Sequence, residues 1–249
     1  MKINHILISQ TISVGSSSPY IELCKNKNVK IDFRSFIEIK GASCSEVRKQ
    51  KINFSDFTVV IFISKKSVDH YFRLAKSMKF KVPLTMKYIC QNEAIAYYLH
   101  KYIVYRKRKV YIGKKSFKDI IPYIKKHPKE KFFLPSSDIL KSDILHMLNE
   151  VNVFWKRGIL YKTYSSDLSD LNIYYDILVF FSPAEIKSLF DNFPNFHQKN
   201  VKIATFGKNT LDAASKAGLK IEIKVPTPEF PSMAMALNKY IKESNKITI

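Results

Sequence analysis

One pattern occurs twice near the carboxyl end of the chain, in YDILVFFSPAEIKSLF (residues 175–190) and again in VKIATFGKNTLDAASKAG (201–218). In each copy a short apolar run, 177–181 or 201–206, ends in small polar residues and is followed at once by a helical pattern. Short apolar runs bounded by turn residues and followed by helices are typical of buried parallel strands. At one edge of such a sheet, the free N–H groups of helix amino ends attract anions. The stretch therefore predicts an α/β fold with an anion-binding edge.

The same strand–helix units are found earlier in the chain. Three middle segments align in order with three later ones: 56–72 with 175–190, 86–101 with 201–218 and, more loosely, 110–124 with 221–237. Because order and spacing agree, we expect two similar parallel-sheet α/β lobes.

Neither copy of the repeat contains enough strands to form a sheet alone. The amino-terminal strand at 2–9 most easily completes the sheet of the carboxyl-terminal copy. We therefore expect one discontinuous lobe and one inserted lobe, joined by two crossings of the chain that could act as a hinge. The expected boundaries are 1–35 plus 167–249 for the discontinuous lobe, 40–160 for the inserted lobe, and 36–39 and 161–166 for the linker crossings.

Several connections are predicted from turn residues and alternation. We expect a mobile Ser/Gly-rich loop at 11–19 and an interruption between strands at 41–50. A short strand is expected at 104–105. A loop tip is expected at Pro135-Ser136-Ser137, followed at once by a helix over 138–151.

The 249-residue chain carries a formal net charge of +21. A charge of this size suggests nucleic acid, an anionic membrane or an acidic ligand. An AT-rich genome would also supply much of the lysine without any function attached, since Lys, Asn, Ile, Phe and Tyr are all abundant. The run 106–109, with Tyr102 and Tyr105, is either a nucleic-acid patch or a solvated surface beside a turn, and the second is favoured.

Other classes of protein and site are not supported. No apolar run approaches the ~20 residues of a membrane span, and no signal peptide is recognised, so we expect a cytoplasmic protein.

Cys24, Cys44 and Cys90 form no close pair, which excludes a CxxC site and argues against disulfides. The six histidines are dispersed, without metal-ligand spacing. Arg108 stands where a phosphate loop ending at Gly113 would need glycine. We expect no metal and no cofactor.

Together with the two echoing lobes, four short motifs resemble those of uroporphyrinogen-III synthase: FFSP at 180–183, FGKNT at 206–210, LYKT at 160–163 and PTPE at 226–229. The similarity extends in order over nearly the whole chain. It is greatest to the Bacteroidetes type, through VIFISKKSVDHYF (60–72), NEAIAYYLHKYIVYRKRK (92–109), SSDLSDL (165–171) and FPSM (230–233).

The resemblance implies two α/β lobes joined by a two-stranded linker, with the active site in the cleft between them. It implies a lyase of tetrapyrrole (haem) biosynthesis that uses no metal or organic cofactor. The enzyme would close hydroxymethylbilane, a linear tetrapyrrole with eight carboxylates, to uroporphyrinogen III, inverting ring D and eliminating water. We expect a monomer that binds neither nucleic acid nor membrane.

The resemblance also implies site residues. Tyr161 corresponds to a tyrosine that faces the cleft, and we expect it to donate a hydrogen bond to the leaving hydroxyl; packing at the lobe junction is the alternative. The expected substrate-binding residues are loop-tip groups in both lobes: Ser64, Asn92, Ser136, Ser137, Ser182, Pro183, Gly207, Lys208, Asn209 and Thr210. For Ser182 and Pro183 the alternative is a helix cap. Lys208 and Asn209 replace a proline and a threonine that are usual in the family.

Two other functions stay open from the residues. A basic two-lobe nucleic-acid-binding protein would need basic and aromatic side chains on one continuous surface, whereas the lysines are spread along every predicted helix. A two-lobe sensor of small anions would need no catalytic group.

Overall fold

The computed structural model describes residues 2–11 and 18–246. The predicted mobile loop at 11–19 therefore lies mostly outside the described residues. The chain forms two compact units, Met1–Glu38 with Tyr164–Ile249 (the first unit) and Ile39–Thr163 (the second unit). No described helix has the length and apolar character needed to cross a membrane.

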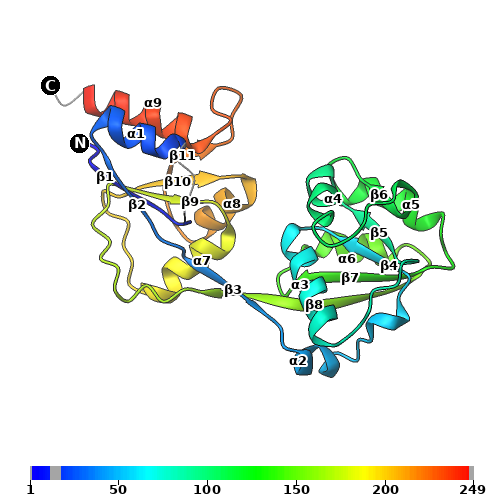
Figure 1. Ribbon diagram of the computed structural model, residues 1–249. Coiled ribbons are helices and arrows are strands. Elements are labelled where there is room, and N and C mark those ends of the chain that lie inside the picture. The colour runs from blue at the N-terminus through cyan, green and yellow to red at the C-terminus, as the bar shows by residue number, and fades with distance from the viewer. Residues whose placement is uncertain (1, 12–17, 247–249) are drawn as a thin grey trace. The chain divides into compact units, whose positions relative to one another are not determined.

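The first unit contains a five-stranded sheet in the order β11-β10-β9-β1-β2 (Figure 1). All of its neighbouring strands are parallel. The strands span His5–Ile8 (β1), Lys30–Phe33 (β2), Ile177–Phe180 (β9), Lys202–Phe206 (β10) and Ile221–Val225 (β11). Two strands from the amino end of the chain thus complete a sheet with three strands from its carboxyl end.

Helices cover both faces of this sheet. Their bounds are Pro19–Lys27 (α1), Pro183–Asn192 (α7), Lys208–Lys216 (α8) and Met233–Lys246 (α9). In Figure 1, α1 and α9 lie on one face and α7 and α8 on the other. Ile177 and Val179 pack on the α1–α9 side, and Leu178 and Phe180 pack on the opposite side. Because β9 is buried on both faces, its sequence is a continuous apolar run.

The second unit contains a six-stranded sheet in the order β3-β8-β7-β4-β5-β6. From β8 to β6, neighbouring strands are again parallel. The strands span Ile37–Gly41 (β3), Val59–Phe62 (β4), Lys87–Cys90 (β5), Val110–Ile112 (β6), Lys131–Ser137 (β7) and Phe154–Ser165 (β8). The middle segments of the internal repeat, β4, β5 and β6, occupy the same sheet positions as β9, β10 and β11.

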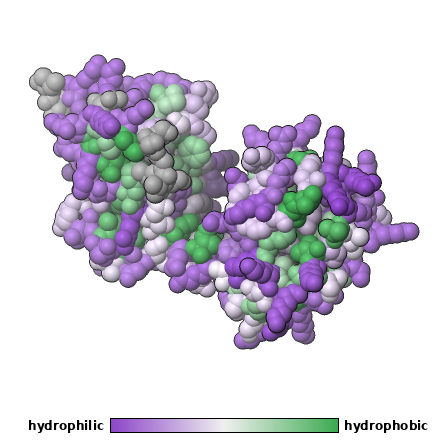
Figure 2. Space-filling view, in the orientation of Figure 1, coloured by the Kyte–Doolittle hydropathy of each residue, from purple (hydrophilic) through white to green (hydrophobic). Residues whose placement is uncertain are grey.

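The helices of the second unit are Cys44–Lys49 (α2), Lys65–Ser77 (α3), Glu93–Leu99 (α4), Ile121–Lys125 (α5) and Ser142–Asn149 (α6). Two apolar clusters lie on the two faces of the sheet, one with α3 and α4, the other with α5 and α6. The chain is therefore an α/β protein with two predominantly parallel sheets, as its sequence predicts. Figure 2 shows hydrophilic side chains over most of the visible surface of each unit.

Three local predictions, at 104–105, at 135–137 and for the start of the helix over 138–151, are wrong, and one helix was not predicted. Residues 41–50 contain helix α2, which starts with a capping box between Ser43 and Glu46 and buries Val47. Strand β7 continues through Ser137 instead of ending at a loop tip, because β8 is long enough to pair with it there. No strand is formed at 104–105, where the backbone is irregular.

Helix α6 also begins at Ser142, not at residue 138 as predicted. Asp138 is held by β8 instead. Its backbone N–H donates to the carbonyl of Tyr161, and its carboxylate accepts the backbone N–H of Thr163 at 3.1 Å. The carboxylate that would cap a helix beginning at residue 138 thus faces β8.

The imidazole ring of His70, in helix α3, packs against strand β8. The rings of His70 and Tyr161 are stacked, with centroids 4.8 Å apart and planes 18° apart. Arg73 Nε donates to His70 Nδ1 at 3.3 Å, and Arg73 Nη2 donates to the Ala42 carbonyl at 2.7 Å. Burial, followed by the charge of Arg73, lowers the pKa of His70 below its ordinary value.

The first prediction concerns Gly158, where β8 crosses a buried ring. A Cβ at this position would lie 2.6 Å from Phe133 Cζ, and Phe133 is fully buried. We expect Gly158→Ala to lower the free energy of unfolding of the second unit by about 1–3 kcal/mol, the usual cost of overpacking. The measurement is urea unfolding followed by the fluorescence of Trp155, the single tryptophan, which lies in β8.

Phe133→Leu provides the matched control. In the double variant the smaller side chain relieves the clash, so its loss of stability should be less than the sum of the two single losses. If the two losses of stability were strictly additive, the Phe133 ring would not be the reason that glycine is required at position 158.

The second prediction concerns pH. The lowered pKa of His70 means that its neutral ring contributes stability that is fully present above the unfolded-state pKa of about 6.5 and is lost as pH falls through the folded-state pKa. We expect the stability advantage of the wild type over His70→Gln to shrink between about pH 7.5 and about pH 5. Unfolding of both proteins by urea across this range checks it, and curves that stay parallel would refute it.

Candidate functional site

The second unit brings several of the predicted residues to one edge of its sheet. Strands β4, β5, β7 and β8 are parallel, so their carboxyl ends lie at the same edge. Ser64 follows β4, Asn92 follows β5, and Ser137 is the last residue of β7. Tyr161 of β8 is the register partner of Ser137. This edge is the part of the second unit in which anion-binding N–H groups are expected.

Ser64 and Tyr161 are joined directly. Ser64 is the N-cap of α3, and its Oγ accepts the backbone N–H of Ser67 at 3.0 Å. The Tyr161 hydroxyl lies 3.0 Å from the same Oγ. Because Ser64 already accepts one bond, it can donate its own proton to Tyr161 and leave the phenolic proton for another acceptor.

The environment of Tyr161 keeps its hydroxyl protonated. The residue is 7% exposed and is stacked against His70. Burial raises the pKa of Tyr161 above its ordinary value, an effect that Ser64 and Ser137 partly oppose by hydrogen bonding. Tyr161 is thus packed in the core of the second unit, with its hydroxyl at the carboxyl edge of the sheet. Its role toward a substrate stays a prediction.

Asn92 caps helix α4. Its Oδ1 accepts the backbone N–H of Ile95 at 3.1 Å, and its side chain is half-buried. Among the described residues no acceptor is recorded for the two N–H groups of its amide, so an incoming oxygen atom could accept them. Lys65 and Lys66, exposed in the first turn of α3, add positive charge to the same edge.

Ser136 does not lie at a loop tip as predicted. It is fully buried in β7, its hydroxyl donates to the Ser137 carbonyl at 3.0 Å, and it accepts Arg157 Nε at 2.9 Å. Arg157 also donates to the carbonyls of Ser137 and Asp138, at 2.7 and 2.8 Å. Sequence analysis did not identify Arg157, because a single arginine within a half-buried strand does not by itself indicate a site.

The first unit has an equivalent edge, held together by Glu185. This carboxylate is 1% exposed and accepts the Ser9 hydroxyl and the Phe181 N–H, each at 2.6 Å. It also accepts the Ser182 N–H at 3.2 Å and Gln10 Nε2 at 3.3 Å. Glu185 therefore ties the end of β1 to the end of β9. Sequence analysis missed it, although Ser-Pro-Ala-Glu at 182–185 has the spacing of a capping box.

Two helices begin at this edge. Ser182 stands at the predicted N-cap position of α7, and Pro183 is the first residue of the helix. The Ser182 hydroxyl itself has no hydrogen-bond partner among the described residues. Gly207, with φ of +86°, is the N-cap of α8 and donates its N–H to the Val225 carbonyl at 2.6 Å. A positive φ of this size favours glycine.

The residues after Gly207 belong to the first turn of α8 and not to a loop. Lys208 and Asn209 are exposed, whereas Thr210 is 2% exposed. Lys208 and Asn209 can therefore reach a ligand, and Thr210 supports the turn from within. In the described part of the chain, no three His, Cys, Asp or Glu side chains are grouped so that they could hold a metal ion.

Comparison with known proteins points to one family. The sequence model of the family described as "Uroporphyrinogen-III synthase HemD" matches residues 18–234. No curated protein matches the chain in sequence.

Solved structures share its fold. A uroporphyrinogen III synthase mutant from the extremely thermophilic bacterium Thermus thermophilus is 14% identical, with a TM-score of 0.60 over 98% of this chain and 99% of that one. The uroporphyrinogen-III synthetase of Helicobacter pylori is 16% identical, with a TM-score of 0.62 over 97% of this chain and 100% of that one. The family match covers most of the sequence, and the chain belongs to the uroporphyrinogen-III synthase HemD family.

Proposed function

We propose that this chain closes hydroxymethylbilane to uroporphyrinogen III, eliminating water and inverting ring D, and that the carboxyl edges of both sheets bind the substrate. The family match over residues 18–234 carries this proposal. Such a synthase is a hydro-lyase of porphyrin biosynthesis.

The substrate's eight carboxylates would meet backbone N–H groups and a few side chains. Helices α3, α4, α7 and α8 all begin at the carboxyl edges, at Ser64, Asn92, Ser182 and Gly207. Near the protein surface, the amino end of a helix stabilises a neighbouring carboxylate by about 0.3–1 kcal/mol. Several such ends, with Lys208 and Asn209 beside one of them, would hold an octa-acid without a dense cluster of arginines.

Positioning is the main catalytic task. Hydroxymethylbilane loses its hydroxyl and cyclises unaided, but to the uninverted isomer. The enzyme must therefore hold the chain so that the ring D carbon that already bears the bridge reaches the electrophilic carbon, which leads through a spiro intermediate. Orientation of this kind can contribute about 7–11 kcal/mol to lowering a barrier.

Tyr161 would assist departure of the hydroxyl group. As the C–O bond breaks, the pyrrole nitrogen supplies the electron pair and gives up its N–H proton, and the oxygen leaves as water after gaining a proton. A phenol with a raised pKa stays protonated and donates a hydrogen bond to the developing negative charge. Ser64, 3.0 Å away, would orient that hydroxyl by donating to its oxygen.

Finer features remain part of the proposal. The motifs at 60–72, 92–109, 165–171 and 230–233 support the Bacteroidetes type of the enzyme. We also propose that the protein acts as a monomer in the cytoplasm, without a metal or an organic cofactor, as the family resemblance suggests.

The third prediction tests the activity itself. Purified protein incubated with hydroxymethylbilane and a chelator should yield isomer III, because the held substrate cyclises only after ring D inverts. The oxidised products are separated by liquid chromatography, with heat-denatured protein as the control that yields isomer I. Isomer I alone from the native protein would rule out the proposed activity.

The fourth prediction concerns Tyr161. Removal of its hydroxyl in Tyr161→Phe should lower kcat by about 10²-fold, at the low end of general-acid effects, with KM little changed. The lost bond to Ser64 should lower stability by only about 1 kcal/mol. The matched control is Tyr97→Phe in the same unit, where the ring is 80% exposed and no effect is expected. An unchanged kcat in Tyr161→Phe would assign Tyr161 to packing alone.

A further inference from the structure

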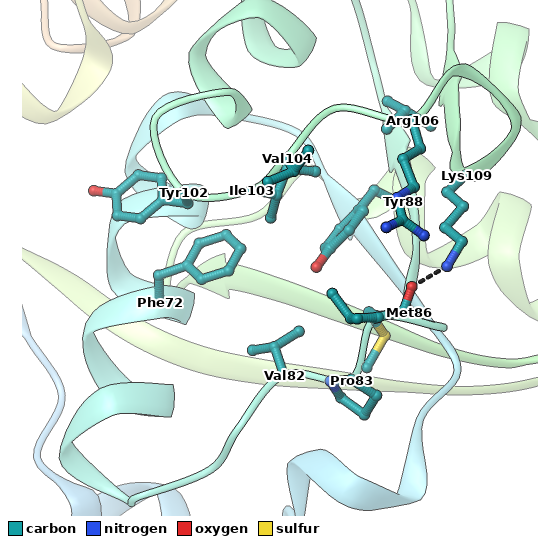
Figure 3. Close-up of a pocket in the computed structure, with 12 residues that line it drawn as sticks. Phe72, Val82, Pro83, Met86, Tyr88, Tyr102, Ile103, Val104, Arg106 and Lys109 are labelled. Atoms are coloured by element: carbon teal, nitrogen blue, oxygen red, sulfur yellow. Dashed lines mark hydrogen bonds between the residues drawn. The ribbon is translucent and has the colours of Figure 1, made fainter.

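The second unit contains an apolar pocket of about 260 Å³ at the amino-terminal ends of β5 and β6 (Figure 3). Met86 immediately precedes β5 and Val110 begins β6, and both line the pocket. Asn92 of the candidate site follows the other end of β5. The pocket therefore lies at the opposite edge of the sheet from the candidate site.

The interior suits an apolar group of limited size. Phe72 of α3 and the side chains of Val82, Met86 and Ile103 surround the space (Figure 3). This space would hold one aromatic ring or a short acyl chain, and it is too small for a tetrapyrrole.

Apolar side chains continue to the rim of the pocket. Leu84 is 76% exposed and Val104 is 82% exposed, and both line it. The Tyr88 hydroxyl points into the space among these groups (Figure 3). Burial raises the pKa of Tyr88, so this hydroxyl remains a donor. A ligand would cover exposed apolar surface and meet one buried polar group.

Two cations lie on one side of the pocket. Arg106 and Lys109 line it, and Lys109 Nζ also donates to the carbonyl of Leu84 (Figure 3). Residues 94–118 contain no Asp or Glu. Within the described part of the chain, neither cation is paired with a carboxylate. The local positive potential is therefore available to an anion.

A stacking surface for nucleic acid is not supported here. The Tyr102 ring is stacked on Phe72, with centroids 4.7 Å apart and planes 4° apart, and its hydroxyl donates to Asp69 at 2.6 Å. The face of the Tyr102 ring that contacts Phe72 therefore cannot stack on a base. Of the two tyrosines beside the basic run 106–109, only Tyr105 has a ring that is not stacked on Phe72.

We propose that this pocket binds a small carboxylic acid whose body is a single aromatic ring or a short acyl chain. The apolar body lies against Phe72, Val82 and Ile103, and the carboxylate lies beside Arg106 and Lys109. The Tyr88 hydroxyl supplies a further donor. This site does not depend on the proposed cyclisation, because it lies at the other edge of the sheet.

The test uses para-fluorophenylpropionate as the probe and para-fluorophenylpropanol as its neutral match, each titrated with the full chain and followed by fluorine NMR. We expect saturable broadening of the carboxylate probe and weaker binding of the alcohol. Arg106→Ala should weaken binding of the carboxylate about two- to fivefold, as loss of one exposed charge contact does. Arg108→Ala is the matched control, since it removes the same charge from the same run outside the pocket.

A second variant tests the cavity itself. Val82→Phe fills the space and should abolish saturable binding, while thermal melting checks that the variant is folded. The proposal is overturned if binding does not saturate at millimolar probe, if the alcohol binds as tightly as the acid, or if Arg108→Ala weakens binding as much as Arg106→Ala. Because the readout is binding and not turnover, the outcome is independent of the isomer produced from the bilane.

Discussion

Burial of parallel strands on both faces is the constraint on which the rest of the structure depends. In β9, Ile177 and Val179 enter one apolar cluster while Leu178 and Phe180 enter another. Each such side chain contributes about 1.5–3 kcal/mol when it is buried. Since every crossover must then carry a helix over one face, helix amino ends gather at one edge of each sheet. The anion-binding edges that we propose are therefore a consequence of how the two cores are packed.

This constraint explains how much could be predicted from the sequence. Strands buried on both faces, such as β4 and β9, have continuous apolar runs and were predicted directly, and the repeated units indicate two similar α/β lobes. The end of β7 was missed because Pro135–Ser137 has no apolar signal and is extended only by pairing with β8. Helix α2 was missed because it is a short helix with one buried side chain, Val47.

For the candidate site, the family resemblance supplied residues but not their contacts. Ser64 and Tyr161 are 97 positions apart, and only the fold shows that their hydroxyls are 3.0 Å apart. Glu185 and Arg157 were not predicted because the partners that give them their roles, the Ser9 hydroxyl and the Ser137 carbonyl, are 176 and 20 positions away in the sequence. Glu185 and Arg157 hold the strand ends at which a ligand would bind. Substitution of either is therefore expected to change how the ligand is positioned, and to affect the chemical step only through that change.

The central claim is that backbone N–H groups at the carboxyl edges of both sheets bind the carboxylates of the tetrapyrrole. The most direct measurement is the change in backbone amide NMR shifts of the isotope-labelled chain on titration with uroporphyrinogen III under nitrogen. The account predicts that the largest changes fall on the first turns of α3, α4, α7 and α8, with none at the amino ends of β5 and β6. Changes confined to one unit, or centred on the amino edge of either sheet, would contradict it.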